Sequence, residues 1–189
     1  MGFYDKEENI DKYAQFIPNH DGAELISVLK TQLAKNSTVL ELGIGPGKDF
    51  ELLANDYEVT GSDRSLVFLD KYRKKNPHAE LLQLDARTLE TDKTFDCIYS
   101  NKVLIHLTRE ELGQSLARQR EILNDNGLLM HSFWHGDKED VYDDLRITYY
   151  TERQLLDMMK ELYEVVEIKT HAKMTEGDSV YVLARARAT

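Results

Sequence analysis

The sequence predicts an α/β fold in which helices cover both faces of a mostly parallel sheet. Short apolar runs alternate with helix-type segments along most of the 189 residues, a pattern typical of parallel strands that are buried on both faces. The last quarter instead holds two strand-like runs that too few residues separate for a crossover helix. We therefore expect those two runs to pair as an antiparallel hairpin.

Seven strand-like runs account for the sheet. Five of them alternate with helices, at residues 39–43, 58–63, 80–85, 95–100 and 127–134. The hairpin uses the remaining two, residues 163–170 and 179–184, joined around Glu176-Gly177-Asp178. Together they predict a doubly wound sheet whose last strand is reversed.

Two of the helices carry a capping box, in which a Ser or Thr and the Glu or Gln three residues later satisfy each other's backbone amides. Thr108 with Glu111 and Thr151 with Gln154 match it. Leucine and methionine residues behind each cap recur at helical spacing. We therefore predict that helices begin at these two positions.

Two further helices are predicted from spacing alone. Residues 21–35 have leucines at i, i+4 and i+8, which places them on one helical face. After residue 63, we expect Ser65 to cap a helix whose inward side chains are Leu66, Leu69 and Tyr72. No repeat or linker divides the chain, so we expect one domain over residues 1–189, with a helical cap at 1–36 and the α/β core at 37–189.

Composition and charge narrow the possible partners. Lys plus Arg total 24 and Asp plus Glu total 34, a net charge of −10, which disfavours nucleic acids and anionic membranes. The start of the chain lacks a signal peptide's apolar segment, and no apolar run approaches the ~20 residues that cross a bilayer. The single cysteine, Cys97, excludes an internal disulfide and a multi-cysteine zinc site. We expect a cytoplasmic monomer or homodimer with Cys97 in its core.

A glycine loop follows the first predicted strand. Gly43, Gly45 and Gly47 alternate with other residues, and glycines are needed where a chain turns sharply and a ligand lies against the backbone. The spacing is G-x-G-x-G, whereas dinucleotide-binding loops have G-x-G-x-x-G. Glu41, two residues before the loop, would repel a pyrophosphate and suits a ligand that carries an ammonium group.

Two acidic residues end the next two strands. Asp63 is placed to accept hydrogen bonds from the vicinal hydroxyls of a ribose. Asp85 is placed to accept from an adenine amino group, while the backbone of Ala86 and Arg87 meets the edge of the ring. The alternative for both carboxylates is that they cap the following helices. Taken with Glu41, they indicate an adenosine that carries an amino acid.

These features resemble the class I S-adenosylmethionine-dependent methyltransferases, of the small type 11-like branch, over about residues 37–185. Glu41-x-Gly43-x-Gly45-x-Gly47 matches the first family motif, and Asp63 and Asp85 match the second and third. The resemblance implies a Rossmann-like sheet of order 3-2-1-4-5-7-6 with strand 7 antiparallel. It also implies S-adenosylmethionine as cofactor, no metal, and Arg64, Ala86 and Asn101 among the residues that line the donor pocket.

The same resemblance places the acceptor pocket over the ends of the fourth and fifth strands. His106 lies within reach as a candidate general base, and the alternative is that it only orders the loop before Thr108. Trp134 and Tyr150 are candidates for the pocket wall. Aromatic residues that could complete a lid and pocket, or equally serve as packing, are Tyr4, Tyr13, Tyr149 and Tyr150. In contrast, His131 is expected to be a satisfied histidine of the core.

An acidic segment at residues 136–144, GDKEDVYDD, follows the fifth strand. Such a run is usually a solvated loop, and the alternative is that it attracts a cationic acceptor. The sequence as a whole predicts methylation of oxygen or nitrogen on a small molecule. The second hypothesis is a non-catalytic sensor or scaffold that binds S-adenosylmethionine. A third, an NAD-dependent oxidoreductase, would require the G-x-G-x-x-G spacing and another parallel crossover in place of the hairpin.

Overall fold

A computed structural model describes residues 21–142 and 145–188. Most of the expected N-terminal helical cap, with Tyr4 and Tyr13, lies outside these residues. The same holds for Asp143 and Asp144 of the acidic segment.

One seven-stranded sheet organises the molecule, with the strand order β3-β2-β1-β4-β5-β9-β8. Its strands are β1 Thr38–Leu42, β2 Glu58–Asp63, β3 Glu80–Gln83, β4 Phe95–Asn101, β5 Leu123–Trp134, β8 Tyr163–His171 and β9 Ser179–Ala186. The first five strands pair in parallel, whereas β9 is antiparallel to both β5 and β8. The predicted order, hairpin and reversed strand are confirmed.

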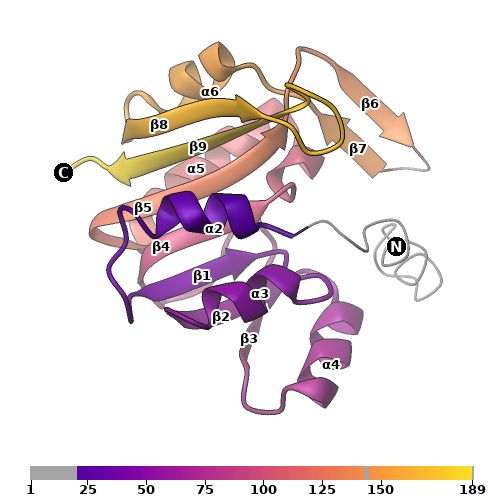
Figure 1. The fold of residues 1–189 in the computed structure, drawn as a ribbon, viewed down its shortest axis with the longest axis vertical. Coiled ribbons are helices and arrows are strands. Elements are labelled where there is room, and N and C mark those ends of the chain that lie inside the picture. The colour runs from indigo at the N-terminus through magenta and orange to yellow at the C-terminus, as the bar shows by residue number, and fades with distance from the viewer. Residues whose placement is uncertain (1–20, 143–144, 189) are drawn as a thin grey trace.

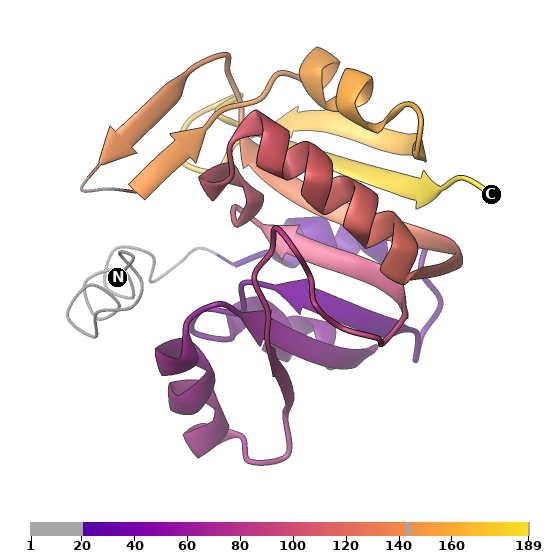
Figure 2. The ribbon, with the colours of Figure 1, turned by 180° about the vertical axis from the view of Figure 1, so that it is seen from behind.

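Helices lie on both faces of the sheet. They are α2 Ala23–Leu29, α3 Lys48–Leu53, α4 Leu66–Lys75, α5 Arg109–Ile122 and α6 Glu152–Met159, with a short 3₁₀ helix, η2, at Leu104–His106. Helices α2 and α3 lie in front of the sheet in Figure 1. Helix α5 lies in front of it in the opposite view of Figure 2. This is the doubly wound arrangement that the sequence predicts.

Two apolar layers hold the helices against the sheet. Because successive strand residues point to opposite faces, Leu40 and Ile98 pack in the layer that includes α5 and α6. Their neighbours Val39 and Cys97 pack in the layer that includes α2. Cys97 has no exposed surface and is a core residue, as expected. None of the helices in residues 21–142 and 145–188 is long and apolar enough to cross a membrane.

Both predicted capping boxes form. Thr108 Oγ1 accepts a hydrogen bond from the Glu111 amide at 3.1 Å, and the Glu111 carboxylate accepts from the Thr108 amide at 2.9 Å. Thr151 and Gln154 make the same reciprocal pair at the start of α6. Each box therefore fixes where the chain turns from the carboxyl edge of the sheet into a helix.

The helices predicted at residues 21–35 and after Ser65 differ from their expected form. Helix α2 ends at Leu29 and not near residue 35, because the chain then tightens into turns in which Thr31 and Gln32 bond three residues back. At the start of α4, no Ser65 side-chain bond caps the helix. The Asp63 carboxylate instead accepts from the Ser65 amide at 2.8 Å.

The inward face of α4 was also predicted wrongly at one position. Leu66 is 52% exposed, whereas Phe68 is buried beside Leu69 and Tyr72. The helix begins at Leu66, so this side chain leaves the first turn on the solvent side. Leu69 and Tyr72 were therefore predicted correctly, and Phe68 takes the place of Leu66 on the buried face.

The acidic segment after β5 contributes a strand that was not predicted. Strands β6 (Glu139–Tyr142) and β7 (Leu145–Thr148) pair as a separate antiparallel sheet. Val141 and Tyr142 are 64% and 60% exposed. Strand β6 therefore has no buried apolar face from which the hairpin could be predicted. It is anchored from β7, where the Thr148 hydroxyl donates to the Leu107 carbonyl at 2.9 Å.

Replacing Thr108 with alanine tests how much the capping box contributes to stability. The substitution leaves the Glu111 amide without its side-chain acceptor, so we expect the free energy of unfolding to fall by about 1 kcal/mol. Urea denaturation followed by circular dichroism measures it. Thr108→Ser keeps the hydroxyl and should stay close to the wild type; equal losses in both variants would contradict the cap's role.

Candidate functional site

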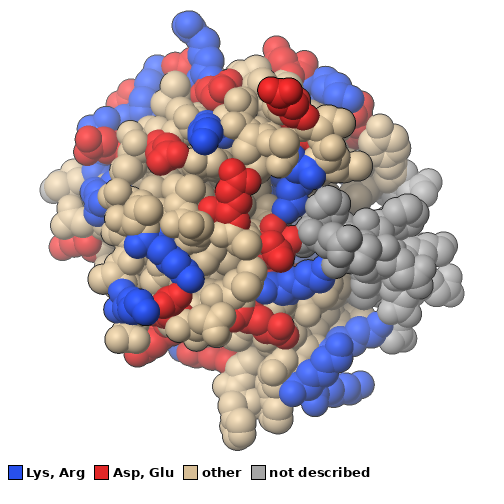
Figure 3. All heavy atoms as spheres, viewed as in Figure 1, with Lys and Arg blue, Asp and Glu red and all other residues tan. Residues whose placement is uncertain are grey.

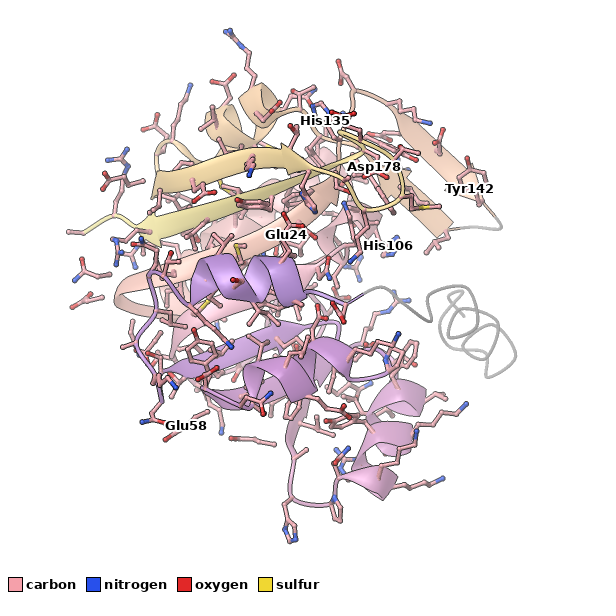
Figure 4. All side chains as sticks on the ribbon, viewed as in Figure 1. Glu24, Glu58, His106, His135, Tyr142 and Asp178 are labelled. Carbon is pink, nitrogen blue, oxygen red and sulfur yellow. The ribbon has the colours of Figure 1, made fainter. Side chains whose placement is uncertain are left out.

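A cavity of about 330 Å³ opens at the carboxyl ends of the parallel strands. Its wall includes residues from the glycine loop, the turns after β2 and β3, the segment after β4, and β7. Sequence-predicted residues in it are Gly43, Gly45, Asp63, Arg64, Asp85, Ala86 and His106. In Figure 4, His106 lies at the end of the sheet toward which β1 points. The topology thus brings together residues that are more than 60 positions apart in the chain.

The three glycines of the loop have different structural reasons. All have positive φ, at 68°, 50° and 91° for Gly43, Gly45 and Gly47. A Cβ on Gly43 would lie 2.6 Å from Val103, and one on Gly47 would lie 2.0 Å from the Tyr72 ring. A Cβ on Gly45 would meet no atom closer than 4.0 Å. Gly45 therefore borders open space, whereas Gly47, which is not among the cavity-lining residues, makes room for a side chain of α4.

Asp63 joins two of the loops that form the cavity. One carboxylate oxygen accepts from the Gly45 amide at 3.1 Å and the other from the Ser65 amide at 2.8 Å. Burial raises the pKa of Asp63, and these backbone amides oppose the rise. The carboxylate thus fixes the path of the glycine loop and remains part of the cavity wall.

Glu41 is buried beneath the loop, with 3% of its surface exposed. Within the part of the chain that the structure describes, its Oε2 atom has no hydrogen-bond partner. Burial first, and then the nearby charges of Asp49 and Asp63, raise the pKa of Glu41 well above its usual range. An ammonium group placed beside this carboxyl would satisfy the orphaned oxygen and restore its charge. Glu41 itself is not among the cavity-lining residues, although Leu42 and Gly43 are.

Asp49 is a residue of this region that sequence reasoning missed. Its carboxylate accepts from the Gly22 amide at 2.6 Å, from the Tyr99 hydroxyl at 2.8 Å and from the Asn101 side chain at 3.0 Å. It therefore ties the start of α2 to the end of β4. The only local signal was an acidic residue in the first turn of α3, which is ordinarily explained by the helix dipole.

Asn101 belongs to this network and not to the cavity wall. Its Nδ2 donates to Asp49, and its Oδ1 accepts from the Ser132 hydroxyl at 2.6 Å. Both ends of the amide are thus paired within the chain. Asn101 is not among the cavity-lining residues, so its predicted contact with the donor stays a prediction.

Arg87 lies in the cavity wall and forms ion pairs with two acids, Asp85 and Glu111. Its guanidinium lies 2.5 Å from Asp85 and 3.3 Å from Glu111 at the start of α5. The Arg87 side-chain bonds to Asp85 hold the pKa of that carboxyl below its usual range. Asp85 is therefore charged, and an incoming hydrogen-bond donor must share it with Arg87.

His106 lies in η2 at the border between the cavity and β7. Its Nδ1 is 2.8 Å from the Arg146 carbonyl oxygen, which can only accept, so Nδ1 carries the proton of the neutral ring and Nε2 is the basic nitrogen. Burial lowers the pKa of His106, and the nearby charge of Arg64 lowers it further. The side chain therefore has a fixed tautomer and is neutral at physiological pH.

Trp134 and Tyr150, the predicted acceptor contacts, are not among the residues that line this cavity. The Lys102 ammonium lies 4.1 Å from the centre of the Trp134 ring. Tyr150 is completely buried and packs edge-on against Phe133, with ring centres 5.1 Å apart. Their role toward an acceptor stays a prediction.

Comparison with known proteins agrees with this geometry. Residues 39–127 match the family model of a methyltransferase domain. That match runs from β1 to the beginning of β5 and includes the ends of β1, β2, β3 and β4, which border the cavity. Over these residues the chain is similar to methyltransferase domains, and its fold is that of solved S-adenosylmethionine-dependent methyltransferases.

Individual relatives of this chain are distant. It is 26% identical over 149 residues to an uncharacterized methyltransferase of Alkaliphilus oremlandii, covering 77% of this chain and 69% of that protein. It is 35% identical over 79 residues to a trans-aconitate 2-methyltransferase of Variovorax paradoxus, covering 40% of this chain and 30% of that one. The chain therefore spans less than a third of the second relative.

A solved structure resembles this chain over nearly its whole length. It is the 1,6-didemethyltoxoflavin-N1-methyltransferase of Burkholderia thailandensis, bound to 1,6-didemethyltoxoflavin and S-adenosylhomocysteine. The TM-score is 0.80 at 18% identity, with 94% of this chain and 83% of that chain covered. At this identity the likeness is one of fold.

Side chains of the acidic segment after β5 form ion pairs within the protein. Asp137 lies 3.3 Å from Arg109, and Asp140 lies 2.7 Å from Lys138. Glu139 pairs with Arg146. Figure 3 shows acidic and basic side chains interspersed over the visible face, without a continuous patch of either sign. The structure therefore gives the cationic-acceptor hypothesis no support.

Among the described residues, no three His, Cys, Asp or Glu side chains gather as a metal site.

The different roles of the glycines can be separated by their stability costs. Gly45→Ala and Gly47→Ala both force alanine into the left-handed region, at about 1–2 kcal/mol. Gly47→Ala also drives a methyl group into the Tyr72 ring, so we expect it to cost at least about 1 kcal/mol more. Chemical denaturation of the two variants checks the difference, and equal costs would contradict the assigned contact.

Proposed function

We propose that the protein transfers a methyl group from S-adenosylmethionine to an oxygen or nitrogen atom of a small molecule. The observation that carries the proposal is the set of three acids near the ends of β1, β2 and β3, two of which line the cavity while the third lies buried beneath the glycine loop. Glu41 is buried with an orphaned oxygen, while Asp63 and Asp85 form part of the cavity wall. Their order matches an amino acid, a ribose and an adenine.

Each part of the donor has a proposed partner in the chain. Glu41 pairs with the ammonium group, Asp63 accepts from the ribose hydroxyls, and Asp85 accepts from the adenine amino group. The backbone of Ala86 meets the adenine edge, and Gly45 leaves room beside the loop. The other proposed donor contacts are Gly43, Gly47, Arg64 and Asn101. Bound S-adenosylmethionine supplies an electrophilic methyl group on its sulfonium.

The named relatives support a small acceptor. The Burkholderia structure contains 1,6-didemethyltoxoflavin, and the Variovorax relative is named for trans-aconitate. Both acceptors are small molecules, and this supports the same class of acceptor here.

His106 is the proposed general base. An oxygen or nitrogen nucleophile loses a proton during methylation, and a neutral imidazole can accept it. The Arg146 carbonyl holds Nδ1 of His106, so the basic Nε2 has a fixed direction. Most of the remaining acceleration is expected from positioning the acceptor in line with the methyl group.

The proposed setting is the cytoplasm, with no nucleic-acid partner. The net charge of −10 and the single cysteine, Cys97, support this. A monomer and a homodimer are both compatible with the proposal. The alternative of a non-catalytic sensor keeps the same donor site and differs only in turnover.

Calorimetric titration with S-adenosylhomocysteine and NAD tests the donor site. We expect binding of S-adenosylhomocysteine, no binding of NAD, and at least about a tenfold loss of affinity in Asp63→Ala, because a charge-assisted hydrogen bond is lost. Asp92→Ala, at an exposed position outside the cavity, is the matched control and should bind as the wild type does. Binding of NAD alone would overturn the proposal. An acceptor screen that follows S-adenosylhomocysteine release then separates an enzyme from a sensor.

The pH dependence of turnover tests His106. The neutral ring is the base and its pKa is lowered, so kcat should be flat near pH 7 and fall only below the ordinary histidine range. His106→Gln should lower kcat and abolish the acidic limb, with little change in the affinity for S-adenosylhomocysteine. An acidic limb that persists in the variant would show that another group titrates.

A further inference from the structure

Four polar side chains form a continuous hydrogen-bonded chain through the apolar layer beside the Asp85 end of the cavity. They are Ser100 on β4, His131 on β5, and Gln119 and Ser115 on α5, and none of them has exposed surface. The chain ends where the Ser115 hydroxyl donates to the Ala86 carbonyl oxygen at 2.6 Å. Buried polar groups cost free energy unless each is paired, so a fully paired chain that reaches the cavity wall suggests a role beyond packing.

The Ala86 carbonyl determines the direction of every bond, because it can only accept. Ser115 donates its proton to it, so the Ser115 oxygen accepts from the Gln119 amide nitrogen at 3.0 Å. The Gln119 oxygen then faces His131 Nε2 at 2.7 Å, which makes Nε2 the protonated nitrogen. His131 Nδ1 accepts from the Ser100 hydroxyl at 2.9 Å. A single backbone oxygen thus fixes the state of all four side chains.

His131 suits this arrangement because it does not titrate near neutral pH. Complete burial lowers the pKa of His131 to about 3, so the ring stays neutral and keeps one tautomer. The parallel register of β4 and β5 places Ser100 opposite His131. The sequence-based expectation that His131 is a satisfied histidine of the core is confirmed. Its hydrogen-bond partners connect it to Ala86 in the cavity wall.

The hydrogen-bonded series of side chains constrains the peptide unit between Ala86 and Arg87. The carbonyl of this unit accepts from Ser115, and its N–H donates to the Asp85 carboxylate at 2.9 Å. Because a peptide unit is planar, fixing its carbonyl also fixes its N–H. Ser115 therefore sets the orientation of the plane that holds Asp85.

We propose that Ser100, His131, Gln119 and Ser115 form a positioning relay that orients Asp85 to select an adenine amino group. The inference rests on the proposed function, in which Asp85 accepts from that group. Within the described residues, none of the four lines the cavity, so they are positioning residues. A fixed carboxylate accepts from an amino group and repels the 6-oxo oxygen of hypoxanthine, because both are acceptors. The relay thus serves the choice of base.

The test compares two nucleoside ligands in wild type and Ser115→Ala. Titration calorimetry gives the Kd of S-adenosylhomocysteine and of S-inosylhomocysteine, in which oxygen replaces the adenine amino group. We expect the wild type to prefer S-adenosylhomocysteine, and Ser115→Ala to lose about tenfold of that preference. Gln119→Met leaves the Ser115 bond to Ala86 without its support, and should lose preference in the same direction. It carries the test if Ser115→Ala does not fold.

Tyr163→Phe is the matched control. It removes a buried hydroxyl that donates at 2.6 Å to the Leu116 carbonyl of the same helix, with no connection to Ala86. Its preference for the two ligands should equal that of the wild type, even if its stability falls.

The outcomes separate the relay from the proposed function. An unchanged preference in the folded relay variants, or an equal loss in Tyr163→Phe, overturns the relay while the donor site stands. A wild type that binds S-adenosylhomocysteine no tighter than S-inosylhomocysteine overturns the assignment of Asp85 and the relay with it. A wild type that binds neither ligand overturns the proposed function itself.

Discussion

The Asp63 carboxylate is the interaction on which the site depends. It accepts from the amides of Gly45 and Ser65, and so joins the loop after β1 to the turn after β2. Parallel register makes this possible, because Leu42 pairs with Ser62 and both strands end at the same edge. Glycines at positive φ have little preference for any one path. The hydrogen bond to the Asp63 carboxylate holds the loop in one conformation. In this conformation the space beside Gly45 is open.

Charge is distributed unevenly along the cavity, and this orients the proposed donor. Beneath the glycine loop, burial and the charges of Asp49 and Asp63 raise the pKa of Glu41. A cation bound beside Glu41 would therefore stabilise its charged form. In the cavity wall, Arg87 neutralises Asp85. These charges favour the proposed orientation, in which the ammonium group of S-adenosylmethionine lies at Glu41 and the uncharged adenine lies beside Asp85 and Arg87.

The sheet and most backbone positions of the site were predictable because their signals are local. Apolar runs, capping boxes and a glycine loop each occupy a few consecutive residues, and they predicted the strands, the terminal hairpin, two helix starts and the acids at the strand ends. The strand order was implied by the family resemblance. The remaining features depend on contacts across the fold. Gly47 is required by Tyr72, and Arg87 is paired with Glu111, which no spacing in the sequence reveals. The β6–β7 hairpin was missed because each strand has only four residues, and in β6 the apolar side chains Val141 and Tyr142 are exposed.

The most direct test of the central claim is a crystal structure of the protein with S-adenosylhomocysteine. We expect the ribose hydroxyls on Asp63, the adenine between Asp85 and Ala86, and the ammonium group against Glu41. A ligand bound away from these strand ends, or one turned so that its adenine lies beside Glu41, would contradict the account.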